Sequence, residues 1–199
     1  DYVRIIDYKT GGKEIRIYNI INGLDLQLVV YMISAKHKKT KDGLEELMPV
    51  GAFYLPLKDE LVNIKDQYSK DLVAASFEDK FKMEGLIVKI NDQVIEMMDR
   101  DFSKKSQVFA LRRGNENIFT EEENQILEDY VKDLIANNIK EIKGGKISLR
   151  PMRYGDSSYE CANCAYRGIC KIDYTIDQDR FRELDRTKKI DDLKGKKDD

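Results

Sequence analysis

Residues 5–11 read Ile-Ile-Asp-Tyr-Lys-Thr-Gly, and this stretch decides how the rest of the chain is interpreted. Side chains alternate between the two faces of an extended strand, so Asp7 and Lys9 are expected to project together, with Tyr8 on the opposite side. A carboxylate can hold a divalent metal ion, and an ammonium group beside it can stabilise an anion such as a phosphate oxygen. Asp-x-Lys pairs are also common in ordinary sheets, so the stretch needs support from elsewhere in the chain.

Length and composition limit the classes of protein to consider. A chain of 199 residues with 41% hydrophobic residues can form one ordinary domain with a real core, with or without a small appendage. The net charge of −2 gives no overall basic signature, so any contact with nucleic acid depends on local patches. No apolar run approaches the length of a membrane span and no signal peptide is visible, so we expect a cytoplasmic protein without a membrane partner. The chain begins at Asp1 instead of Met, and we expect a piece of a longer protein.

Hydrophobic periodicity predicts alternating strands and helices. The longest predicted helix begins with a capping box, because Thr120 is followed three residues later by Glu123, and it ends at a pair of glycines. The segment 58–82 is expected to be irregular with some helix. Strands or short extended pieces are expected at 1–9, 14–18, 48–57, 85–90 and 107–111, and helices at 24–38, 93–101 (helix or turn) and 120–142.

The three cysteines fall within ten residues, at Cys161, Cys164 and Cys170. An odd number at this spacing argues against a secreted disulfide framework and favours metal or cluster ligation in a reducing compartment. Zinc held by three cysteines and an outside ligand is the weaker alternative. His37 lies in a lysine run at the expected end of a helix, and we interpret it as solvated, without a catalytic or metal-binding role.

Three features taken together resemble a known family. The strand motif at 5–11, Gln27-x3-Tyr31 on one face of the following helix, and the closing Cys-x2-Cys-x5-Cys are similar to the RecB-type branch of the PD-(D/E)XK nucleases. Within that branch they most resemble AddB-type nuclease domains, over about residues 1 to 175. The resemblance implies an α/β (α+β) fold with a restriction-endonuclease-like core, a mixed central sheet flanked by helices, and a C-terminal cysteine staple.

The resemblance also implies an activity and a set of site residues. The catalytic residues would be Asp7, Lys9, Gln27 and Tyr31, and Mg²⁺ would bind Asp7 and the backbone carbonyl of Tyr8. The three cysteines would hold a 4Fe-4S cluster whose fourth cysteine lies outside this chain. The implied function is a DNA exonuclease domain of an ATP-dependent helicase–nuclease that processes double-strand DNA ends for recombinational repair. Its partners would be DNA ends, the single-stranded product strand and an AddA-like helicase subunit. The family also uses an acidic residue upstream of Asp-x-Lys, so this chain alone is expected to cleave DNA weakly or not at all.

The expected organisation is a partial nuclease domain over 1–160, an iron–sulfur segment over 161–175 and a charged, flexible tail over 176–199. One alternative is a CRISPR-associated adaptation nuclease of the same fold, although the long interval between Tyr31 and Cys161 favours the AddB type. Another is a catalytically silent scaffold of this fold that binds DNA and a partner, and the presence of both Asp7 and Lys9 favours an enzyme over it. A redox or zinc-binding regulator would leave the strand and helix motifs unexplained.

Overall fold

The structure is a computed structural model, and it describes residues 1–11, 13–40, 43–57, 81–102, 106–112, 114, 116–154, 161, 164–173 and 175–194. All but the last two residues of the segment 58–82, which the sequence predicts to be irregular with some helix, lie outside these described residues.

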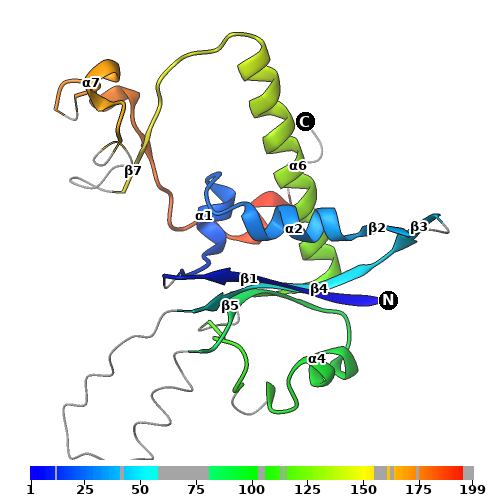
Figure 1. The fold of residues 1–199 in the computed structure, drawn as a ribbon. Coiled ribbons are helices and arrows are strands. Elements are labelled where there is room, and N and C mark those ends of the chain that lie inside the picture. Colours follow the sequence, from blue (N-terminus) through cyan, green and yellow to red (C-terminus); the bar gives the residue numbers. More distant parts are fainter. Residues whose placement is uncertain are drawn as a thin grey trace, which may run out of the picture.

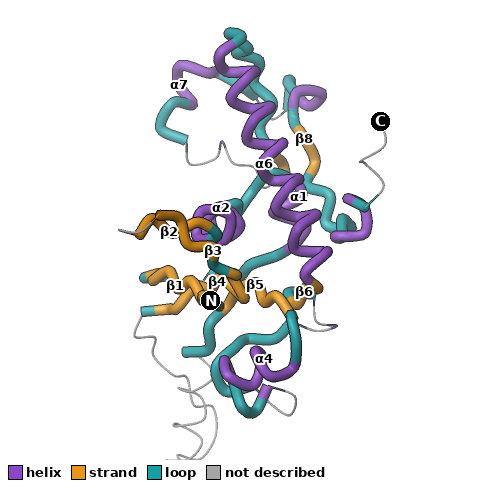
Figure 2. Tube along the Cα trace, turned by 90° about the vertical axis from the view of Figure 1, so that its right-hand side faces the viewer, coloured by secondary structure: helices purple, strands orange, loops and turns teal. Residues whose placement is uncertain are grey.

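A four-stranded sheet forms the centre of the molecule, in the order β1-β4-β5-β6 (Figures 1 and 2). Strands β1 and β4 pair in parallel, β4 and β5 antiparallel, and β5 and β6 in parallel, so the sheet is mixed, as the sequence predicts. Their bounds are β1 Tyr2–Lys9, β4 Met48–Pro56, β5 Glu84–Lys89 and β6 Ile118–Thr120. Among the described residues β1 has a neighbour on one side only, so the Asp-x-Lys strand lies at an edge of the sheet.

Helices cover both faces of this sheet (Figure 1). The main core lies between the sheet and the helices α1 (Ile17–Ile21), α2 (Gln27–Ala35) and α6 (Glu121–Lys143). A second, smaller core lies on the opposite face, where α4 (Asp92–Met98) packs beside a stacked pair of rings, Phe53 and Phe109, with centroids 4.7 Å apart. The strands of the sheet are therefore buried on both faces, which explains the nearly unbroken apolar run in β4.

The capped helix agrees most closely with its prediction. Thr120 accepts a hydrogen bond from the backbone N–H of Glu123, and the Glu123 carboxylate accepts one from the backbone N–H of Thr120, so the capping box is complete. The helix continues to Lys143 and ends at Gly144. Only its N-terminal half is buried against the sheet and α2, and its C-terminal half projects away from the body (Figure 1).

Two local predictions are wrong. The segment 14–18 is not a strand, because Ile17, Ile20 and Ile21 have helical spacing and form α1, with the last two buried. The helix expected over 24–38 is shorter, at Gln27–Ala35, because Asp25 before it has a positive φ of 52°. At its other end His37 is exposed and begins β2 (His37–Thr40), which pairs with β3 (Gly43–Glu46).

Two further short segments refine their predictions. The expected helix or turn at 93–101 is the helix α4, and the extended piece at 107–111 forms only a single bridge, between Phe109 and Met83.

The chain after the cysteines packs against the body, unlike the flexible tail that its composition predicts. Leu193, in a short 3-10 helix η4 (Ile190–Leu193), belongs to the main core, and Phe181 is also buried. Asn22 donates a hydrogen bond to the carbonyl of Asp185 and so ties this segment to the loop after α1. The remaining short elements are α7 (Arg167–Cys170), η3 (Gln178–Arg180) and the parallel pair β7 (Met152–Arg153) and β8 (Arg182–Glu183). The domain boundaries themselves stay predictions.

Candidate active site

The Asp-x-Lys motif lies at the C-terminal end of β1. Strand alternation places Asp7 and Lys9 on the face that carries α2, while Tyr8 points to the other side and is 62% exposed. The parallel register sets Asp7 beside Tyr54 of β4. The side chains of Asp7 and Lys9 are 23% and 28% exposed, so both are partly shielded from water and still reachable.

A line of contacts joins the four residues that the sequence singles out. The Lys9 ammonium lies 2.7 Å from Asp7 Oδ2 and donates a hydrogen bond of 2.9 Å to Gln27 Oε1. Gln27 in turn donates through Nε2 to the Tyr31 hydroxyl at 2.7 Å. Gln27 is the first residue of α2 and Tyr31 lies one turn later, so the helix begins where it can reach the end of the strand. The structure thus brings together Asp7, Lys9, Gln27 and Tyr31.

The Asp7 carboxylate fits a divalent cation. Its Oδ2 is buried and, although Lys9 is close, the geometry of that contact does not make a hydrogen bond, so no described residue donates one to this oxygen. A buried carboxylate oxygen without a donor is costly, and a hard cation would satisfy it. Asp7 supplies one protein ligand only, and the described residues contain no group of three or more His, Cys, Asp or Glu side chains placed around one metal position.

Tyr54 is a site residue that the sequence analysis missed. It is 1% exposed, it neighbours Asp7 on the sheet, and its hydroxyl has no hydrogen-bond partner among the described residues. Burial, assisted by the carboxylates of Asp25 and Asp7, raises the pKa of the Tyr54 hydroxyl to about 12, so the group stays protonated at neutral pH. The apolar run of β4 identifies a buried strand but not the register that sets Tyr54 beside Asp7.

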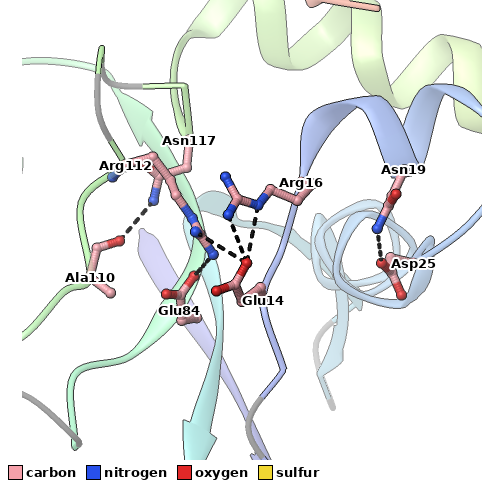
Figure 3. A network of polar contacts seen from close by, with 8 residues as sticks. All are labelled: Glu14, Arg16, Asn19, Asp25, Glu84, Ala110, Arg112 and Asn117. Carbon is pink, nitrogen blue, oxygen red and sulfur yellow. Dashed lines mark hydrogen bonds and ion pairs between the residues drawn. The ribbon is translucent and has the colours of Figure 1, made fainter. Parts of the chain in front are cut away.

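A second lysine also reaches this end of the sheet. Lys13, from the loop after β1, pairs with Asp25 at 2.8 Å, and Asp25 accepts a hydrogen bond of 2.8 Å from Asn19 (Figure 3). The positive φ of Asp25 turns its carboxylate back toward α1 and the loop. Asp tolerates this conformation better than most residues.

A match to a family model decides the classification. The model of the PD-(D/E)XK nuclease superfamily matches residues 1–171. The chain belongs to the PD-(D/E)XK nuclease superfamily. The mixed sheet, the helices on both of its faces and the position of Asp7 and Lys9 at a strand end are consistent with that nuclease fold.

Curated relatives of this superfamily member share one description, a subunit of an ATP-dependent helicase/deoxyribonuclease. The chain is 28% identical over 194 residues to this subunit from Clostridium novyi, and the match covers 94% of this chain and 17% of that protein. The same subunits from Clostridium tetani and Thermoanaerobacter sp. are 30% and 26% identical, over 94% and 90% of this chain and 17% and 16% of their own lengths. The chain therefore spans about one sixth of the length of the relatives it matches.

The three cysteines lie apart from the Asp-x-Lys site, in the segment that includes α7 (Figure 1). Cys164 is exposed and Cys161 and Cys170 are half-buried, and Cys164 donates its backbone N–H to the carbonyl of Cys161 at 3.2 Å. Their thiol chemistry fits an iron–sulfur or zinc site. They are not gathered around one point within the described part of the chain. A cluster at this segment stays a prediction.

None of the described helices combines the length and apolar character needed to cross a membrane.

Proposed function

We propose that this chain is the nuclease part of an ATP-dependent helicase–deoxyribonuclease and that it hydrolyses phosphodiester bonds of DNA with a divalent metal ion. The observation that carries the proposal is the line of contacts from Asp7 through Lys9 and Gln27 to Tyr31 at one end of the sheet. The relatives are named as subunits of a helicase/deoxyribonuclease, which supports the same activity and favours it over a CRISPR-associated nuclease.

Each side chain has a physical role in this proposal. Asp7, with the backbone carbonyl of Tyr8, holds a Mg²⁺ ion, which supplies Lewis-acid stabilisation of the phosphate and a water of lowered pKa. Lys9 carries the positive charge that meets the negative charge developing on the phosphate oxygens. Gln27 fixes the Lys9 ammonium through the 2.9 Å bond, and Tyr31 fixes the amide of Gln27 from its outer side. Tyr31 is 37% exposed and can also contact the DNA backbone.

The partners follow from the same proposal. We expect DNA ends and the single-stranded product strand as substrates, an AddA-like subunit as the source of ATP-driven unwinding, and the cytoplasm as the location. Cys161, Cys164 and Cys170 would supply three ligands of a 4Fe-4S cluster, with a fourth cysteine from elsewhere in a longer protein. Metal analysis and the visible absorbance of protein purified without oxygen test this cluster, and a zinc-loaded, colourless protein would contradict it.

The experiment compares linear and covalently closed circular DNA, incubated with Mg²⁺ and either this chain or the longer natural protein that contains it. End-dependent activity predicts degradation of the linear DNA alone. Equal cutting of the circle would contradict an exonuclease. DNA binding without cleavage of either substrate, in the longer protein with its helicase partner, would instead favour the catalytically silent scaffold.

A further inference from the structure

Tyr54 lies under the proposed catalytic lysine, although the hydrolysis outlined above gives it no role. Its ring centroid is 5.0 Å from Lys9 Nζ and 5.6 Å from Lys13 Nζ. Both distances fall within the roughly 6 Å at which the negative face of an aromatic ring attracts a cation. One buried ring therefore contacts two ammonium groups that come from different parts of the chain.

The ring differs from the other partners of these lysines because it carries no net charge. Asp7 and Asp25 each pair with one ammonium, at 2.7 and 2.8 Å, and each neutralises it in part. A ring attracts the same cations without adding a negative charge that would repel a phosphate group. Tyr54 can thus hold the two lysines in place and leave their positive charge available to an anionic substrate.

The loop that carries Lys13 is itself anchored to the sheet (Figure 3). Glu14 accepts from Arg16 at 2.8 Å and lies 3.4 Å from Arg112, whose other terminal nitrogen is 2.6 Å from Glu84 of β5. Glu84 is the register partner of Tyr54 on the neighbouring strand. Because the residue next to Lys13 is tied to the strand beside Tyr54, the position of Lys13 over the ring is built into the fold.

We propose that Tyr54 is a positioning residue of this site, whose ring orients Lys9 toward the phosphate that is cleaved and Lys13 toward a second phosphate of the same strand. The inference rests on the proposed nuclease function and sharpens its substrate class: a nucleic-acid strand with at least two phosphate groups. Lys13 is 38% exposed, so a phosphate group can reach it beside Asp25. The unpaired hydroxyl has no part in this role, and Tyr54→Phe should keep it.

The ring is tested by changing its charge distribution at constant shape, in the longer natural protein with its helicase partner. Tyr54 is replaced by Phe and by trifluorophenylalanine, because fluorine removes the negative face of the ring and leaves the packing nearly unchanged. We expect the Phe variant to keep wild-type kcat within about twofold, and the fluorinated variant to lose about 5- to 30-fold in kcat at nearly constant KM. Equal kcat in both variants would overturn the positioning role, and so would a large loss in Tyr54→Phe.

The second phosphate is tested with substrates of different size. Lys13→Gln should raise KM for a DNA oligonucleotide several-fold and lower the salt dependence of binding by about one counterion. It should leave KM for the p-nitrophenyl ester of thymidine monophosphate, which has a single phosphodiester, unchanged. Lys132→Gln, on the exposed side of α6, is the matched control. An equal change for both substrates would overturn the second-phosphate contact.

The two hypotheses fail in different ways. A wild-type protein that cleaves no DNA would overturn the nuclease function and this inference with it. An active wild-type protein with no effect of fluorination would overturn only the role of Tyr54.

Discussion

The contact between Lys9 and Gln27 gives the sharpest prediction, because a single neutral side chain holds the proposed catalytic ammonium. Gln27→Leu removes the acceptor 2.9 Å from Lys9 Nζ and the donor 2.7 Å from the Tyr31 hydroxyl, while it keeps the helical residue and most of its volume. The lysine then loses the contact that sets its direction and keeps only the ion pair with Asp7.

The size of the effect follows from the type of bond. A hydrogen bond to a charged group contributes about 1.5–3 kcal/mol. Because Lys9 is 28% exposed, water replaces part of the lost contact, and the lower end of that range applies. A loss of about 1.4 kcal/mol in transition-state stabilisation corresponds to about a tenfold lower kcat.

The assay is single-turnover cleavage of an end-labelled duplex by the longer natural protein, with thermal unfolding as a check on folding. Tyr31→Phe is the matched comparison, because it removes only the outer bond to Gln27 and should cost about threefold or less. A folded Gln27→Leu protein that cleaves at the wild-type rate would refute the idea that Gln27 positions Lys9.

The remaining predictions concern stability and are measured by chemical denaturation of this chain. Gly85→Ala should cost about 3 kcal/mol, because the added Cβ would lie 2.1 Å from the carbonyl oxygen of Ala52, whereas Gly168→Ala meets no atom within 4 Å and should change stability by less than about 0.5 kcal/mol. Leu193→Ala should cost about 2–4 kcal/mol if the C-terminal segment is packed into the core, and no measurable amount if it is a solvated tail. Burial raises the pKa of Glu84 above its ordinary value and Arg112 opposes that shift, so Arg112→Met should destabilise the chain increasingly as pH rises above about 4.5. A loss of stability that does not change between pH 4 and pH 7 would contradict that account.

Several features were predictable because they depend on short-range patterns. Strand alternation set Asp7 and Lys9 on one face, helical spacing set Gln27 and Tyr31 on one face, and the capping box at Thr120 fixed the start of α6. Each of these patterns spans only a few residues, so the sequence contains all the information that they need.

Other features depend on contacts between distant parts of the chain. The register between β1 and β4, which sets Tyr54 beside Asp7, cannot be derived from either strand alone. The charged composition of the C-terminal segment hides the fact that Leu193 fills a space in the main core. No sequence pattern indicates that Lys13 reaches the same ring as Lys9, because the loop between them is shaped by ion pairs to another strand.

The central claim is that the carboxylate of Asp7 holds the metal ion for phosphodiester hydrolysis. The most direct measurement is Mg²⁺-dependent degradation of linear DNA by the longer natural protein, in parallel for wild type, Asp7→Asn and the control Asp92→Asn, whose side chain is 83% exposed on α4. The account predicts that Asp7→Asn lowers the rate by at least about a thousandfold, the scale of one key electrostatic group, and that excess Mg²⁺ does not restore it. Asp92→Asn should cleave as the wild type does. An Asp7→Asn protein that still degrades DNA at the wild-type rate would contradict the assignment of the site.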